Sequence, residues 1–289
     1  MDNMDNIKIR TATDSEPDLN GIAGVYNPND GPWSNLETCA ELVTKRLERG
    51  FYIQVAEADG KIVGYSEWVI SDEPDRKFLY LSWLRINDNY QRKGIGRLMI
   101  ADALKHAKKN NCASLVTCPD TGGSAAVFYR KCGFADGRRQ YGLKILAEKY
   151  KDYKFEKTGL DKTPFSVIKE KRLIFGKDVE DSSFSSRQMW EYMNEPPSIG
   201  ANERNPAILL ADGTYIQMQI CGEAGKYICI WTNNTNYADM IKAALSFGYS
   251  LGLNYLDFGY FKEEESFFDG FDVYDKKQGP EFEQIYYIN

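Results

Sequence analysis

A short stretch of glycines and cations at residues 89–97, with the sequence NYQRKGIGR, has the residue types and spacing best suited to chemistry. It lies between an apolar, strand-like run and a helical pattern. Backbone N–H groups in such a loop, and at the start of a helix, point outward and favour negative charge. Gly94 and Gly96 let a ligand approach the backbone closely. Residues 91–97, here called the anion loop, therefore predict a phosphate site.

A mixed α/β pattern surrounds the anion loop over the first half of the chain. Alternating and short apolar runs predict strands, and apolar residues at helical spacing predict helices. The predicted strands are 7–10, 51–57, 62–71, 78–87, 113–118 and 140–147, and the predicted helices are 14–25, 36–48, 98–109 and 124–131. Asp59 and Gly60 predict a hairpin turn, and Asn35 is the expected cap of the second helix.

The bulk properties are those of an ordinary globular protein with two domains. The chain has 289 residues, of which 43% are hydrophobic and 27% charged. A net charge of -6 disfavours nucleic-acid binding. No apolar run is long enough to span a membrane, and the N-terminal residues lack the apolar core of a signal peptide. Six cysteines without CxxC pairs favour a reducing cytoplasm, and a single histidine, His106, argues against a metal site.

Two motifs together resemble the signatures of the GNAT superfamily of N-acetyltransferases. Gln91-x-x-Gly94-x-Gly96 is similar to the family's pyrophosphate motif, (Arg/Gln)-x-x-Gly-x-(Gly/Ala). Residues 125–134 resemble the second signature, an Ala-containing helix that runs into Tyr-x-x-x-Gly-Phe. The resemblance covers about the first half of the chain. One departure is Gly122, which stands where the family often has Asn and puts one contact to the cofactor arm in doubt.

The resemblance implies a central mixed, mainly antiparallel sheet flanked by helices, with acetyl-CoA as the acyl donor. Amides of the anion loop would hold the pyrophosphate, and the preceding strand would splay from its neighbour to admit the pantetheine arm. One backbone N–H there would polarise the thioester carbonyl, and the amine would attack directly in a ternary complex. The cofactor-binding residues implied in this way are Leu84, Arg85, Ile86, Gln91, Arg92, Lys93, Gly94, Ile95, Gly96, Arg97, Ser124 and Phe128.

Tyr129 and Glu67 are the predicted catalytic residues. In the family, the Tyr129 position often holds the general acid that protonates the departing CoA thiolate, which a phenol with a pKa of about 10 can do. The alternative is an aromatic side chain packed against Phe128 and Phe134. Glu67 is a candidate general base that removes the amine proton, often through water. Its alternative is a solvent-facing residue of an alternating strand.

The sequence does not name the acceptor. Ser82 and Trp83 are candidates to shape its pocket, and a packed tryptophan is the alternative for Trp83. Acceptor pockets in the family come from variable segments, which here correspond to residues 27–35 and 71–76.

Residues 151–289 repeat the order of elements without a second anion loop. A hairpin at 207–219, strands at 227–231, 255–261 and 283–288, and a helix at 237–251 are predicted. Residues 232–235 stand at the place of the anion loop without glycine or cation, and Phe268 stands where Tyr129 would. We therefore predict a catalytic domain at 1–150 and a smaller, degenerate GNAT-like domain at 151–289 that helps to shape the acceptor site. The alternative is an unrelated α/β domain.

The leading functional hypothesis is an N-acetyltransferase that moves an acetyl group from acetyl-CoA to a primary amine of a small molecule or peptide. A non-catalytic acyl-CoA-binding regulatory module is one alternative. An aminoacyltransferase-like paired-GNAT protein is another, although the anion loop and the acidic net charge disfavour a protein that uses aminoacyl-tRNA. We expect no nucleic-acid or membrane partner, no metal, a cytoplasmic location, and a monomer or homodimer.

Overall fold

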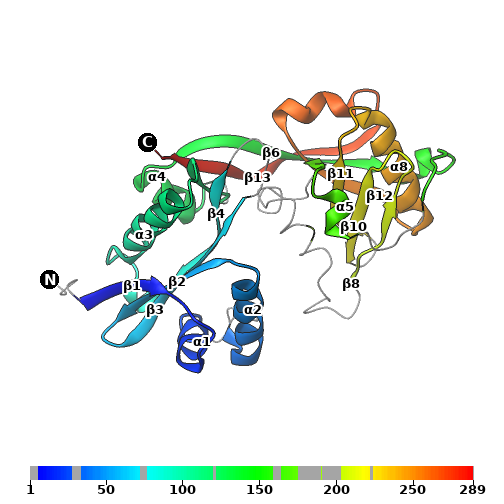
Figure 1. The fold of residues 1–289 in the computed structure, drawn as a ribbon. Helices are drawn as coiled ribbons and strands as arrows, with labels where there is room; N and C mark the ends of the chain where they lie inside the picture. The colour runs from blue at the N-terminus through cyan, green and yellow to red at the C-terminus, as the bar shows by residue number, and fades with distance from the viewer. Residues whose placement is uncertain are drawn as a thin grey trace. The chain divides into compact units, whose positions relative to one another are not determined.

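The computed structural model describes residues 6–27, 34–71, 77–119, 122–158, 164–174, 190, 203–221 and 224–288. They fall into two compact units, which Figure 1 shows as ribbons. The first unit comprises Met1–Thr117, Val127–Ala135 and Ile285–Asn289, and the second comprises Cys118–Ala126 and Asp136–Gln284. This division differs from the single boundary at residue 150 that the sequence suggests. The chain passes from the first unit to the second within a strand that begins at Ala135, and it returns within the last strand, which ends at Tyr287.

The first unit is built on five consecutive strands. They are β1 (Ile7–Thr11), β2 (Tyr52–Ala58), β3 (Lys61–Ile70), β4 (Phe78–Ile86) and β5 (Ser114–Thr117). Neighbours pair antiparallel from β1 to β4, whereas β4 and β5 are parallel. The predicted hairpin turn between β2 and β3 is confirmed: Asp59 and Gly60 have φ angles of 49° and 74°. Both central residues of such a turn need positive φ, which Asp and Gly tolerate.

Helices cover both faces of this sheet (Figure 1). The helices α1 (Glu16–Ala23) and α2 (Leu36–Glu48) pack on the face that carries Ile53, Val55 and Tyr65. The helix α3 (Ile95–Lys109) packs on the other face, where Ala56 and Val63 share a buried cluster with Met99. Successive strand residues point to opposite faces, so a nearly continuous apolar run serves both helix layers. The predicted cap Asn35 is confirmed, since its side chain accepts a 2.9 Å hydrogen bond from the Thr38 N–H.

Two long strands complete the sheet out of sequence order. They are β6 (Ala135–Leu146) and β13 (Val273–Tyr287), and the hydrogen-bonded order is β1-β2-β3-β4-β5-β13-β6-β12. In the first unit, the Ile288 N–H donates to the Ala113 carbonyl at 2.9 Å. In the second unit, β6 pairs antiparallel with β12 (Tyr255–Phe261), and Leu143 and Ile145 of β6 are buried in its core. The sequence predicts a strand at 140–147 but not that β13 separates it from β5.

The second unit repeats the order of elements predicted from the sequence. Its other strands are β7 (Arg172–Ile174), β8 (Glu203–Arg204), β9 (Ala207–Leu209), β10 (Tyr215–Cys221) and β11 (Ala224–Thr232), and its helices include α5 (Phe165–Ile168) and α8 (Tyr237–Ser250). A 3-10 helix, η5 (Lys262–Phe268), precedes β13. Met240 and Ile241 of α8 share a core with Ile216 and Ile230 of the sheet. The predicted mixed α/β fold is confirmed. The second unit, however, is not the smaller of the two, since Asp136–Gln284 alone is longer than Met1–Thr117.

Candidate functional site

The anion loop ends at the start of the helix α3. Gly94 is the N-cap of α3 and has φ +80°, a left-handed conformation in which glycine is not strained. The first helical hydrogen bond runs from the Leu98 N–H to the Gly94 carbonyl at 3.2 Å. The N–H groups of residues 95–97 precede that bond and have no acceptor within the helix. Because the first turn of α3 holds no acidic residue, these donors can bind an anion.

The side chain of Gln91 holds the loop in place. Its Nε2 donates to the Ile86 carbonyl at 3.1 Å and to Asp88 Oδ1 at 2.7 Å. Arg85 also pairs with Asp88, at 3.2 Å. These bonds tie the 3-10 turn η3 (Asp88–Tyr90) to the end of β4. The Gln91 side chain thus contacts the loop's own backbone, whereas the exposed cationic side chains at 92 and 97 remain on the surface of the loop.

The strand β4 has an open edge that leads to the anion loop. Within the described residues, its pairing with β5 runs from Phe78 to Tyr80 and stops there, which agrees with the splay expected from the sequence. At its end, the Asn87 N–H donates to the Val63 carbonyl of β3 at 2.9 Å. Main-chain groups alternate in direction along an antiparallel strand. Those of Leu84 and Ile86 therefore face away from β3, toward the open edge.

Arg85 differs from its two neighbours. Its main chain lies opposite Tyr65 in the ladder with β3, so by the same alternation its N–H and carbonyl face β3. Of the three residues predicted to line a pantetheine arm, Leu84 and Ile86 have the required backbone orientation and Arg85 does not. The Ile86 carbonyl already accepts from Gln91, which leaves its N–H for a ligand.

A β-bulge lies where β4 leaves β5. Glu67 pairs with Trp83, whereas the next residue of β3, Trp68, pairs with Leu81. Ser82 is therefore an additional residue in β4, and such a bulge bends the strand and redirects its groups. No residue pattern in 78–86 predicts it, because a bulge is defined by the pairing with the neighbouring strand.

The helix α4 (Ser124–Lys131) packs Phe128 against the start of α3. A Cβ on Gly96 would lie 2.8 Å from Phe128 Cζ, so the second glycine of the motif is required by this packing. Ser124 is the exposed first residue of α4, and Gly122 before it has φ +80°. The motif glycines thus have separate roles: Gly94 forms the helix cap, and Gly96 admits Phe128.

Tyr129 is buried next to Phe128, with 7% of its surface exposed. Its ring lies 5.1 Å from that of Phe128 and 5.5 Å from that of Phe134, and its hydroxyl hydrogen-bonds the Thr117 side chain. Burial raises the pKa of the Tyr129 phenol above its usual range. The packed alternative and the acid role are therefore compatible, because the packed phenol stays protonated at neutral pH.

Glu67 is fully buried at 0% exposure, so the solvent-facing alternative is wrong. Both carboxylate oxygens accept hydrogen bonds, Oε1 from the Tyr65 hydroxyl and Oε2 from Arg46 Nη1. Arg46 comes from α2, and sequence inspection gives no sign of this partner. Arg46 reaches Glu67 because α2 packs on the face of β3 that carries Glu67.

The part of the chain that carries these residues matches a known protein family. Residues 22–134 match the acetyltransferase (GNAT) family. This part of the chain is a GNAT domain. The GNAT match spans the anion loop, the open edge of β4 and Tyr129, and it supports an acetyltransferase role. A search of curated proteins finds no match.

Solved structures share the GNAT fold over nearly the whole chain. A GCN5-related N-acetyltransferase from Kribbella flavida is 9% identical, with a TM-score of 0.65 over 98% of this chain and 72% of that chain. A second, from Anabaena variabilis ATCC 29413, is 11% identical, with a TM-score of 0.64 over 98% and 73%. A chain from Pyrococcus horikoshii is 13% identical, with a TM-score of 0.56 over 100% and 92%. At these identities the likeness concerns the fold, and it extends over the second unit as well as the GNAT domain.

The corresponding helix start in the second unit is filled by its own side chains. Asn236 caps α8, and its Nδ2 donates to Asp239 Oδ2 at 2.6 Å in the first turn. The Asn236 N–H donates to Asn234 Oδ1 at 2.9 Å, and the Asn234 N–H donates to Thr232 Oγ1 at 2.9 Å. A carboxylate in the first turn of a helix interacts with the positive end of the helix dipole, where an external anion would otherwise bind. This segment therefore does not offer a second anion loop.

We expect one acetyl-CoA to bind per chain. Titration calorimetry of the intact protein should give a stoichiometry of about one, since Asp239 occupies the α8 helix start. A stoichiometry of two would contradict the assignment of a single anion loop.

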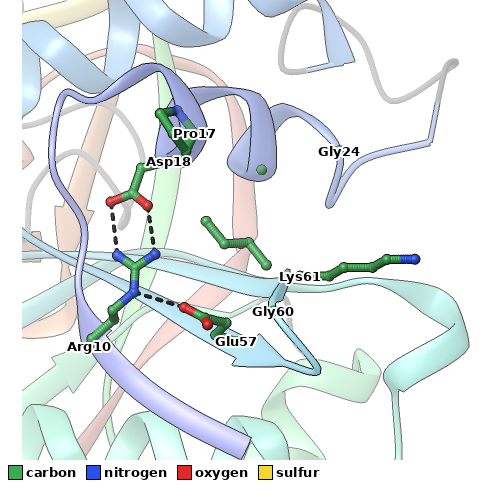
Figure 2. A pocket seen from close by; sticks show the side chains of 9 residues that line it. Arg10, Pro17, Asp18, Gly24, Glu57, Gly60 and Lys61 are labelled. Atoms are coloured by element: carbon green, nitrogen blue, oxygen red, sulfur yellow. Dashed lines mark hydrogen bonds and ion pairs between the residues drawn. The ribbon is translucent and has the colours of Figure 1, made fainter.

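A hollow of about 290 Å3 is lined by residues of β1, α1 and the β2–β3 hairpin and by none of the predicted site residues. Figure 2 shows that Arg10 bridges two carboxylates there. Its guanidinium bonds Asp18 at 2.9 and 2.6 Å, and its Nε bonds Glu57 at 3.0 Å. These bonds tie β1 to α1 and β2. Because the two carboxylates already balance its charge, Arg10 is not available to an anionic ligand.

Replacing Asp18 with Asn is expected to lower the free energy of unfolding by about 1–2 kcal/mol at pH 7. The Arg10 guanidinium lowers the pKa of Asp18 from 3.8 to about 2. A lowered carboxyl pKa stabilises the fold above pH 3.8, and this contribution is lost as the pH falls toward 2. Urea unfolding measures this effect: the free energy of unfolding of Asp18→Asn should differ less from that of the wild type at pH 3 than at pH 7. Glu41→Gln, which breaks an exposed pair with Lys45, is the control and should change little.

The described part of the chain holds no group of three His, Cys, Asp or Glu side chains that could bind a metal ion. Five cysteines of this part have free thiols: Cys39, Cys112, Cys118, Cys132 and Cys229. None of the helices described is long and apolar enough to cross a membrane.

Proposed function

We propose that this protein is an acetyl-CoA-dependent N-acetyltransferase whose acceptor is a primary amine of a small molecule or peptide. The observation that carries the proposal is the open edge of β4, which runs from the end of its pairing at Tyr80 to the anion loop. The edge offers the outward main-chain groups of Leu84 and Ile86, and the loop offers the free N–H groups of α3. An extended donor with a pyrophosphate at one end matches this sequence of groups.

The residues of the site then have separate roles. The N–H groups of residues 95–97 would bind the pyrophosphate, with positive charge from Arg92, Lys93 and Arg97 beside them. A main-chain N–H of the open edge would stabilise the oxyanion that forms when the amine nitrogen attacks the thioester carbonyl. As the carbon–sulfur bond breaks, Tyr129 would donate its proton to the sulfur.

The acceptor side of the site would include Trp83 and Glu67. Trp83 is 39% exposed although it is large and apolar, and it lies opposite Glu67 in the β3–β4 ladder. The two variable segments expected to line the pocket fall mostly outside the described residues, which omit 28–33 and 72–76. The acceptor's identity, a cytoplasmic location and a monomeric or homodimeric state stay predictions.

Thiol release tests the proposal. The purified chain is mixed with acetyl-CoA and, separately, with L-lysine, spermidine, an aminoglycoside and peptides with free N-termini. We expect acetyl-CoA to raise the melting temperature and at least one amine to give saturable release of CoA. Acetyl-CoA binding without turnover across the panel would favour the regulatory module. A failure of acetyl-CoA to bind would contradict the central assignment, and transfer from aminoacyl-tRNA would favour the aminoacyltransferase alternative.

A further inference from the structure

Arg46 and Glu67 form an ion pair in the interior of the first unit. Arg46 lies in the last turn of α2, and its side chain is 25% exposed, whereas the Glu67 side chain is 0% exposed. Arg46 Nη1 donates to Glu67 Oε2, and the Tyr65 hydroxyl donates to Oε1. Arg46 also hydrogen-bonds Tyr65. The carboxylate is therefore held at both oxygens by groups from two different elements.

Among the described residues, the other titratable groups recorded against this pair carry no compensating charge. They are Tyr26, which follows α1, and Cys39 of α2, and both interact electrostatically with Glu67. Burial raises the pKa of Tyr26 above its usual range and that of Cys39 to about 11. Both groups are therefore neutral at pH 7. Within the described residues, the positive charge that balances Glu67 comes from Arg46.

The ion pair lies beside the bulge at which the open edge of β4 begins. Glu67 is paired with Trp83, and Ser82, the additional residue of the bulge, precedes Trp83 directly. The Tyr26 side chain interacts with that of Trp83. The charged pair and the exposed tryptophan thus share one corner of the GNAT domain, on the face covered by α1 and α2.

We propose that Arg46 is a positioning residue for the acceptor side of the site, where it holds the Glu67 carboxylate in one place beside Trp83. The inference rests on the proposed function. A buried carboxylate that loses its partner is strongly disfavoured, so it would move toward water or take up a proton. With Arg46 present, Glu67 supplies a fixed negative charge that stabilises the nitrogen cation formed as the amine attacks. The proton of that nitrogen then leaves to water, which carries it into the solvent.

A double-mutant cycle tests this role. The wild type, Arg46→Gln, Glu67→Gln and the double variant are compared in kcat and KM, with the amine of the panel above that gives the highest rate. We expect each single change to lower kcat by about 10-fold. The double variant should be no slower than Glu67→Gln, since Arg46 acts through that carboxylate. Arg46→Lys should recover part of the lost kcat, because an ammonium can still pair with Glu67 but lacks the planar fork with which Arg46 also reaches Tyr65.

Two controls separate a positioning role from a merely structural one. The dissociation constant for acetyl-CoA should stay within about 2-fold in every folded variant, because Arg46 does not contact the anion loop. Lys45→Gln removes the neighbouring cation of the same helix turn, which pairs with Glu41 on the surface, and it should leave kcat unchanged. If Arg46→Gln does not fold, Arg46→Lys and the charge-neutral double variant carry the comparison. All rates refer to the folded fraction, measured below the melting temperature.

Multiplicative losses in the double variant would overturn the inference, because Arg46 would then act independently of Glu67. A loss of acetyl-CoA affinity parallel to the loss of kcat would also overturn it. In both cases wild-type turnover would leave the proposed function intact. If the wild type turns over no amine of the panel, the proposed function fails and this inference fails with it.

Discussion

Replacing Tyr129 with Phe is expected to lower kcat by about 100-fold and to leave acetyl-CoA affinity within about 2-fold. The change removes the hydroxyl alone, so the packing of the ring against Phe128 and Phe134 is kept. Thr117 loses one hydrogen bond, which costs about 1 kcal/mol of stability. Without the phenol, the departing thiolate must take its proton from water, and the transition state loses a positioned acid.

Steady-state thiol release and calorimetric titration of acetyl-CoA measure the two parts of this prediction. Tyr249→Phe is a matched control, since Tyr249 lies in α8 and is 37% exposed. It should leave both quantities unchanged. Because burial raises the pKa of Tyr129, a general acid at this position also predicts that the wild type keeps activity beyond about pH 10, the usual tyrosine value. An unchanged kcat in Tyr129→Phe would show that its role is packing alone.

Replacing Gly94 with Asp is expected to weaken acetyl-CoA binding by at least about 100-fold. Gly94 is the N-cap of α3, directly before the free N–H groups of residues 95–97. An aspartate there would place its own carboxylate at the helix start, as Asp239 does in α8. It would fill the anion site and repel the pyrophosphate. Asp tolerates the left-handed conformation better than most residues, so the domain should still fold.

Gly50→Asp provides the matched control for this change. Gly50 has the same φ of +80° and lies at the end of α2, and a Cβ added there would meet no other atom within 4 Å. The backbone strain and the added charge are therefore similar, but the anion loop is untouched. Calorimetry should show wild-type acetyl-CoA affinity for Gly50→Asp and none in the measurable range for Gly94→Asp. Equal losses in both variants would point to a general effect on the fold.

Local features of the fold could be predicted because they depend on residues close together in sequence. The helix α2 begins and ends where the sequence predicts, at 36 and 48, because Asn35 caps it and Gly50 follows it. The strand β12 also matches its prediction at 255–261. Around the anion loop, glycine spacing and an acid-free first helical turn are both visible in the sequence. The absence of a second loop at 232–235 is equally local, and the bonds among Thr232, Asn234 and Asn236 agree with it.

Pairings between distant segments could not be predicted in this way. The apolar alternation of residues 140–147 suits any sheet edge, and only the packed structure pairs β6 with β12. The bulge at Ser82 exists only relative to β3. Glu67 has the same neighbours in sequence whether it faces water or Arg46, so its burial depends on where α2 packs.

The sequence by itself determined the family signatures, the single anion loop and most element boundaries, because each follows from short-range spacing and backbone preference. The tertiary structure decided which strand completes each unit, which main-chain groups of β4 face its open edge, and which cation balances Glu67. These depend on contacts between residues far apart in the chain, whose free energies are set by burial and charge compensation in the folded core. Many arrangements share the same local pattern, and packing selects one of them.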